Sequence, residues 1–176
     1  MPATNKNYYI SPPTPKQSRY RRLWVPKLDP AVHNIVIKMD PAPRGITSYW
    51  KLKYFIVWLD TSANVGNRYI LADIRSEDPV SGRDDPIYGL QTGQVPANYY
   101  TAIKILPGSY ISAQVPATPT LSIYEANAAG HASMPDLIIT SNDYFRGLIT
   151  SPLASDLIWA DIMLEYRNDI EGITEQ

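Results

Sequence analysis

The sequence predicts an all-β protein, a sandwich or barrel of antiparallel strands. Short apolar stretches with a period of two recur along the chain, turn-forming residues separate them, and helical periodicity is almost absent. The aromatic residues agree with this prediction, because 13 tyrosines and 4 tryptophans stand against 2 phenylalanines and such residues favour strands. A chain of 176 residues is long enough for one domain with a substantial core.

The first 31 residues differ from the rest in proline content and charge. Of the 16 prolines, 8 lie in the first 43 residues. Residues 1–53 contain 10 Lys and Arg against 2 Asp, whereas residues 54–176 contain 6 against 15 Asp and Glu. Because proline fixes φ and removes a hydrogen-bond donor, we expect residues 1–31 to be an extended basic arm, polyproline-like or irregular. A disordered, solvated tail is the alternative. Residues 32–176 are expected to form the folded domain.

The stretch 48–59 is the longest predicted strand, at roughly 35–40 Å for a rise of about 3.3 Å per residue. In its first half, apolar residues alternate with Lys51 and Lys53, so one face is expected to contact water. Its second half is apolar on both faces, so a second sheet or another subunit is expected to cover it. We therefore expect four consecutive side chains to be buried: Tyr54, Phe55, Ile56 and Val57.

Seven further strands are expected, at 34–39, 68–75, 99–106, 109–115, 120–126, 136–140 and 158–166. Residues 76–93 are polar, and a loop of this length is usually functional or packed at an interface. Residues 142–150 are expected to form a short helix capped by Asn142 or Asp143.

Several classes of function are disfavoured by what the sequence lacks. Without cysteine there is no disulfide, thiolate metal site or cysteine nucleophile. We find no nucleophile elbow, no zinc-protease motif and no phosphate-binding glycine loop, so we expect no enzymatic activity. His33 and His131 have no metal-ligand spacing, and both are expected in loops or at the surface.

No membrane partner is expected. The longest apolar run, 54–59, is far shorter than the ~18 residues that suggest a span. No signal peptide is recognisable, so we expect a soluble protein made in the cytoplasm.

Basic and aromatic residues are interleaved in the segment 16–24, a mixture suited to neutralising phosphates and stacking on bases. The expected nucleic-acid contacts are Lys16, Arg19, Arg21, Arg22 and Lys27 in the arm. Lys51 and Lys53 are added because the first half of the predicted strand 48–59 is expected to lie near the nucleic acid. RNA is favoured over DNA.

The acidic residues of 76–93 allow a second kind of site. Asp78, Asp84 and Asp85 could together bind a hard divalent cation such as calcium between subunits. The alternative is an ordinary solvated acidic loop. No other cofactor is expected.

Two stretches resemble the coat proteins of small icosahedral plant RNA viruses. Residues 66–79 resemble a strand followed by an acidic, proline-ended loop in these coats, and residues 155–166 resemble their closing strand. The resemblance implies an eight-stranded antiparallel jelly-roll sandwich, self-assembly of many copies into a closed shell, and packaging of the genomic nucleic acid by the basic arm. It also implies a location in the virion, with assembly in the host-cell cytoplasm.

A second resemblance is to the plant-virus movement proteins. Leu71-Ala-Asp-Ile-Arg75 is similar to an L-x-D-x-R stretch of that superfamily, which implies an accessory nucleic-acid-binding protein in which Asp73 matters. The ordinary interpretation of Asp73 is a strand residue that faces solvent. A third alternative, from another class, is a β-sandwich module that binds a ligand with exposed tyrosines and tryptophans.

Overall fold

The computed structural model describes residues 4–14, 17, 19–27, 30–41, 48–92, 94–107, 122–123 and 137–168. The strands in these residues are β1 (Thr4–Ile10), β2 (Tyr20–Val25), β3 (Val32–Met39), β4 (Ser48–Asp60), β5 (Tyr69–Glu77), β6 (Asp84–Gln91), β7 (Tyr100–Ile105), β8 (Ser122–Ile123), β9 (Ile138–Ile139), β10 (Asp143–Thr150) and β11 (Leu157–Asn168). The all-β prediction is confirmed. The predicted strand 109–115 and most of 120–126 lie outside the described residues.

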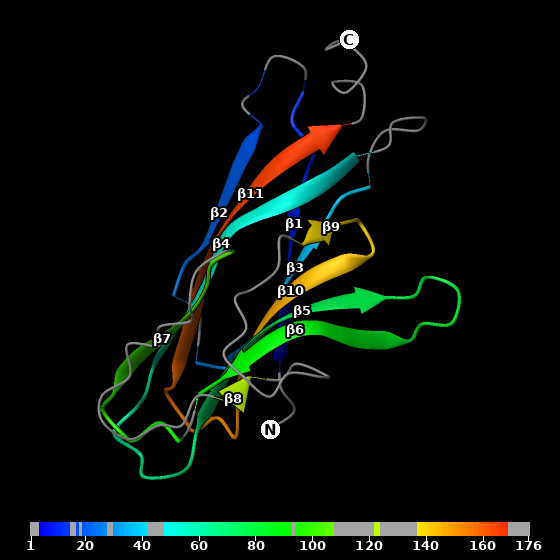
Figure 1. The fold of residues 1–176 in the computed structure, drawn as a ribbon. Coiled ribbons are helices and arrows are strands. Elements are labelled where there is room, and N and C mark those ends of the chain that lie inside the picture. Colours follow the sequence, from blue (N-terminus) through cyan, green and yellow to red (C-terminus); the bar gives the residue numbers. More distant parts are fainter. Residues whose placement is uncertain are drawn as a thin grey trace.

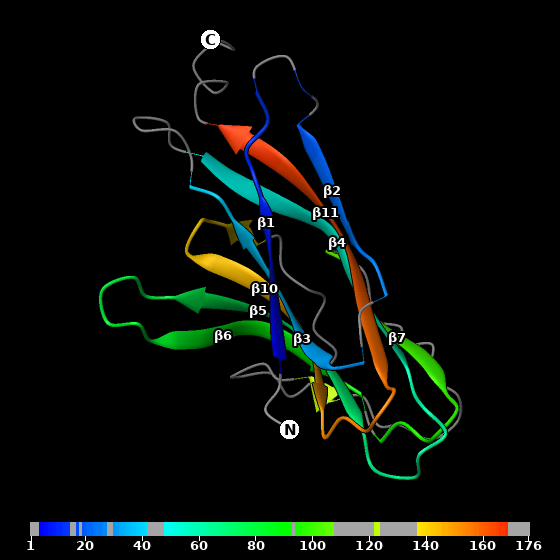
Figure 2. The same cartoon turned by 180° about the vertical axis from the view of Figure 1, so that it is seen from behind.

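Two sheets pack face to face (Figure 1). The first has the order β1-β3-β10-β5-β6-β8, and the second has the order β2-β11-β4-β7, with β9 also paired to β4. Every pairing is antiparallel except that of β1 with β3. Figure 2 shows β1 alongside β3, at the edge of the first sheet.

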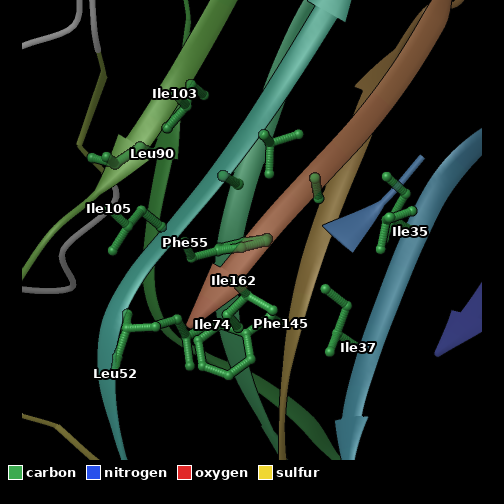
Figure 3. Close-up of a cluster of buried hydrophobic side chains, with 14 of the residues drawn as sticks. Ile35, Ile37, Leu52, Phe55, Ile74, Leu90, Ile103, Ile105, Phe145 and Ile162 are labelled. Atoms are coloured by element: carbon green, nitrogen blue, oxygen red, sulfur yellow. The ribbon is translucent and has the colours of Figure 1, made fainter. Parts of the chain in front are cut away.

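The core lies between the two sheets and is built from alternate residues of each strand (Figure 3). Phe55 of β4 meets Phe145 of β10 with ring centroids 5.3 Å apart, so this pair joins the two sheets. Gly147 of β10 allows the sheets to approach closely, because a Cβ there would lie 2.9 Å from a methyl group of Val57. The core is therefore formed by the apolar residues that recur at every second position of the strands.

A β-bulge interrupts the pairing of β4 with β11. Met163 pairs with Tyr54 and Leu164 pairs with Leu52, which leaves Lys53 as an extra residue. A bulge of this kind changes which residues face each side of the sheet. Beyond Lys53 the alternation is therefore opposite to the one expected from the sequence.

The bulge decides which side chains of β4 are buried. Phe55 and Val57 point into the core with no exposed surface, as predicted. Tyr54 and Ile56 lie on the outer face and are only partly buried. The prediction of burial on both faces is thus wrong for these two side chains.

Residues 1–31 do not form an irregular arm where the structure describes them. β1 pairs with β3 in the first sheet, and β2 pairs with β11 in the second. The prolines occur between these strands, as at Pro12 and Pro13, and not within them. The high proline content of the whole segment therefore concealed two short strands that contain none.

Residues 76–93 are not one long loop, because Asp84–Gln91 forms β6 and pairs with β5. The β5–β6 hairpin extends beyond the neighbouring strands (Figure 1), and the first residues of β6, from Asp84 to Ile87, are exposed. A hairpin end that meets water on both faces has the composition of a loop, which explains the wrong prediction.

Residues 142–150 contain a strand and not a helix. Asp143–Thr150 is β10, which lies between β3 and β5. The Asp143 carboxylate accepts hydrogen bonds from Thr140 N–H at 2.7 Å and Thr140 Oγ1 at 2.8 Å, so it caps a turn. His33, expected in a loop or at the surface, is also a strand residue, buried in β3.

A buried ion pair fixes one end of the sandwich. Arg68 Nε lies 2.7 Å from Asp156 Oδ2, and both side chains have no exposed surface. The Arg68 guanidinium also donates to Asn64 O and Ser62 Oγ, while Asp156 accepts from the N–H groups of Ser62 and Leu153. The pair therefore ties the loop before β5 to the loop before β11.

Candidate nucleic-acid interface

The outer face of the β2–β11–β4–β7 sheet carries an excess of positive charge. A side chain faces outward when it alternates with buried neighbours, as Lys104 does between Ile103 and Ile105. We call this surface the basic face. Among the described residues, its cations are Arg22, Lys27, Lys51, Lys53, Lys104 and Arg167, and its carboxylates are Asp60, Asp161 and Glu165.

Arg22 is held by the neighbouring central strand. Its Nη2 lies 2.7 Å and its Nε 3.0 Å from the two carboxylate oxygens of Asp161. The Asp161 side chain is 6% exposed whereas that of Arg22 is 56% exposed, so the pair presents a cation to solvent. The hydrogen bond from Arg22 to Asp161 raises the pKa of the arginine, which keeps it charged.

Lys53 forms a similar pair at the bulge. Its Nζ lies 2.6 Å from the Glu165 carboxylate, which Arg167 also contacts. Burial raises the pKa of Glu165, but Lys53 and Arg167 together lower it by more, so the pKa lies below its usual value. Lys53 also lies over the ring of Tyr20, 5.7 Å from its centroid. One buried carboxylate thus positions two exposed cations.

Lys27 connects the charged side chains to a group of aromatic rings. Its Nζ lies 2.6 Å from Asp60 Oδ2 and 5.0 Å from the centroid of the Trp159 ring. Lys104, by contrast, is exposed and has no ion-pair partner among the described residues. The basic face therefore offers fixed cations beside ring faces, an arrangement that binds anions and flat groups.

The structure brings some of the predicted nucleic-acid contacts together. Arg22, Lys27, Lys51 and Lys53 lie on the basic face, whereas Lys16 lies outside the described residues. Arg21 points to the other side of β2, and its guanidinium donates to Gln17. The backbone carbonyl of Arg19 accepts a hydrogen bond from Tyr166 N–H.

Sequence reasoning missed two cations of this face. Lys104 comes from β7, and Arg167 comes from the end of β11. Alternation with the buried Ile103 and Ile105 could have indicated the outward direction of Lys104, but not which strands would lie beside it.

The outer face of the other sheet holds a charge-balanced network. Arg146 donates to both oxygens of Asp73, Arg75 Nη1 lies 3.2 Å from the same carboxylate, and Arg75 Nε lies 2.8 Å from Asp84. The Lys38–Glu77 pair adds one charge of each sign, 2.8 Å apart. Asp73, expected to face solvent, is therefore buried beneath two arginines.

A tyrosine completes this network. Tyr144 donates a hydrogen bond of 2.8 Å to Asp84, and burial together with this bond raises the pKa of Tyr144 to about 12. Burial raises the pKa of Asp84, but Arg75 and Tyr144 lower it by more, so the pKa lies below its usual value. Three cations and three carboxylates largely satisfy one another here, unlike those of the basic face.

The three carboxylates of the expected cation site have protein partners in the single chain. Asp78 accepts hydrogen bonds from Val80 N–H and Ser81 Oγ within its turn. Asp85 pairs with Arg83 at 2.8 Å, and Asp84 belongs to the network above. In the part of the chain that the structure describes, no group of three or more His, Cys, Asp or Glu could hold a metal ion. A cation shared between subunits stays a prediction.

No family model matches the chain, and neither a curated protein nor a solved structure is significantly similar to it. Among the described residues, no helix has the length and hydropathy needed to cross a membrane.

Proposed function

We propose that the chain is a structural subunit, a jelly-roll coat protein that assembles in many copies around nucleic acid. The supporting observation is strand order. When the eight strands of the two sheets other than β1, β8 and β9 are numbered along the chain, the orders become 1-8-3-6 and 2-7-4-5. Two interlocked four-stranded sheets with the first and last strands side by side are the arrangement of a jelly roll, which viral capsid domains use.

The proposed contact with nucleic acid is the basic face. Cations that neutralise phosphates provide affinity without reading sequence, which suits a coat that must cover a whole genome. Since β2 belongs to the sheet, the N-terminal cations act as part of a rigid surface in this proposal, in place of a free arm. RNA is the proposed genome.

Purified chain is expected to form particles of uniform size. Sedimentation with simultaneous absorbance at two wavelengths measures both the particle mass and its nucleic-acid content. Closed assemblies follow when one surface of a subunit meets a different surface of the next and the rotation closes. A monomer at all concentrations and salts would contradict the proposal. Small oligomers carrying nucleic acid would support the movement or accessory alternative instead.

Removing three cations of the basic face is expected to weaken the salt dependence of nucleic-acid binding. For Lys27→Gln/Lys53→Gln/Lys104→Gln, the slope of log K against log salt should fall by about two, since each phosphate contact on a single strand contributes ~0.7. The matched control is Lys6→Gln/Lys38→Gln/Arg83→Gln, which removes the same charge from the other sheet and its hairpin. Equal slopes for the two triple variants would rule out the basic face as the contact.

A further inference from the structure

Four aromatic rings from different parts of the chain form a continuous row on the basic face. Trp24 contacts Trp58 with centroids 5.5 Å apart, Trp58 stacks on Trp159 at 6.1 Å and an interplanar angle of 10°, and Trp159 contacts Tyr100 at 5.7 Å. One ring comes from each of β2, β4, β11 and β7. The row therefore crosses the whole sheet.

The row lies outside the hydrophobic core. The inner neighbours of these residues, such as Val25, Leu59 and Ile158, fill the space between the sheets with no exposed surface. The two ends of the row are open to solvent, because Trp24 is 50% and Tyr100 is 58% exposed. Trp159, at 8% exposed, is covered by Lys27 and supports the other rings. Two large rings are thus exposed at the surface, each in contact with another ring of the row.

We propose that this row stacks the bases of single-stranded nucleic acid, with Trp24 and Tyr100 as the two rings that the bases contact. The proposal rests on the proposed function and names the form of its partner. Stacking on aromatic rings beside a positively charged surface is how proteins bind single strands without reading sequence. Duplex DNA or RNA does not fit as well, because its bases are already stacked on each other.

The charge around the row favours nucleic acid over a second copy of the chain as its occupant. Lys27 lies directly over Trp159. Arg22 is two positions before Trp24 on β2, and Lys104 is four positions after Tyr100 on β7, so both point outward beside the row. In the part of the chain that the structure describes, the basic face has six cations against three carboxylates, so two copies meeting through these residues would repel each other. A polyanion with flat bases complements both the charge and the rings.

Fluorescence anisotropy of the full chain with labelled oligodeoxythymidylate, and with a duplex of the same length, tests the proposal. Trp24→Leu/Tyr100→Leu is expected to weaken single-strand binding by about 30-fold or more, because two stacking rings are lost, with an unchanged salt slope, since no cation is removed. Trp24→Phe/Tyr100→Phe keeps an aromatic ring at each position and should retain most of the affinity. Tyr9→Leu, at a ring 60% exposed on the other sheet, is the control and should have no effect. Tight single-strand binding should quench tryptophan fluorescence.

Particle formation is measured on the same samples without nucleic acid, so the two proposals can fail separately. If the chain binds single strands through the row but forms no particles, the coat function fails and the stacking site stands. If the leucine variant binds as well as the original chain, or if the duplex binds as tightly as the single strand, the stacking site is refuted. Loss of assembly with unchanged binding in that variant would also refute it, and would assign the row to a contact between copies.

Discussion

Asp156→Ala is expected to destabilise the chain by about 3–5 kcal/mol, because it leaves the Arg68 guanidinium charged and without its carboxylate in a fully buried site. Both side chains of this pair have no exposed surface, so water cannot replace the lost partner. Urea unfolding followed by fluorescence measures the change as a lower midpoint with an unchanged slope. Asp85→Ala, which removes a carboxylate from an exposed pair, should leave the midpoint almost unchanged.

Removing both charges of the buried pair distinguishes two contributions to stability: the penalty for leaving one charge buried without a partner, and the net stabilisation by the pair itself. Arg68→Met/Asp156→Leu should be clearly more stable than Asp156→Ala, since apolar replacements of a buried pair are often tolerated. A double variant as unstable as the sum of the single changes would show that the hydrogen bonds to the two loops, and not the charges, are essential.

The same pair contributes to acid sensitivity. Burial raises the pKa of Asp156, but Arg68 and the N–H groups of Leu153 and Ser62 lower it by more, so the folded-state pKa lies below the usual value of 3.8. The stabilisation is therefore complete above the unfolded-state pKa and is lost as the pH falls through the folded-state value.

Phe55→Ala is expected to cost about 3–5 kcal/mol, as for other buried phenylalanines. Phe55 is fully buried, and its contact with Phe145 joins the two sheets. The variant should show the loss as a lower urea midpoint. Ile56→Ala, one residue along on the outer face, should cost about 1 kcal/mol or less. Comparable losses of stability at the two positions would mean that the bulge does not direct Phe55 into the core and Ile56 to the outer face.

The elements that the sequence predicts well are those in which apolar residues recur with a period of two. β3, β5 and β11 match their predicted positions because a period of two is set by each strand alone. The prediction of a helix at 142–150 is wrong because Asp143, which resembles a helix N-cap, caps a turn before β10. A capping residue alone does not distinguish a helix from a central strand in a segment of eight residues. The burial of Asp73 beneath Arg146 could be predicted only by knowing that β10 lies beside β5.

The candidate site divides in the same way. The local mixture of cations and rings in 16–24 points to Arg22 and Trp24 as candidates, because neighbours along a strand can be assessed from the sequence. Both lie on the basic face, and their contact with nucleic acid stays a prediction. The row of rings depends on β2, β11, β4 and β7 lying side by side, and residues 24 and 159 are too far apart in the chain for any spacing rule to connect them. The bulge at Lys53 could not be predicted either, because it arises from the pairing of β4 with β11.

The position of β11 between β2 and β4 has a consequence for synthesis. Arg22 and its partner Asp161 are 139 residues apart, so β2 leaves the ribosome long before the strand that it pairs with. The second sheet can close only when residues 157–168 have emerged, and contacts of such long range make folding slow. Until then Trp24 and the neighbouring apolar residues of β2 lack the strand beside which they lie in the folded protein, so the second sheet forms only after β11 has been made.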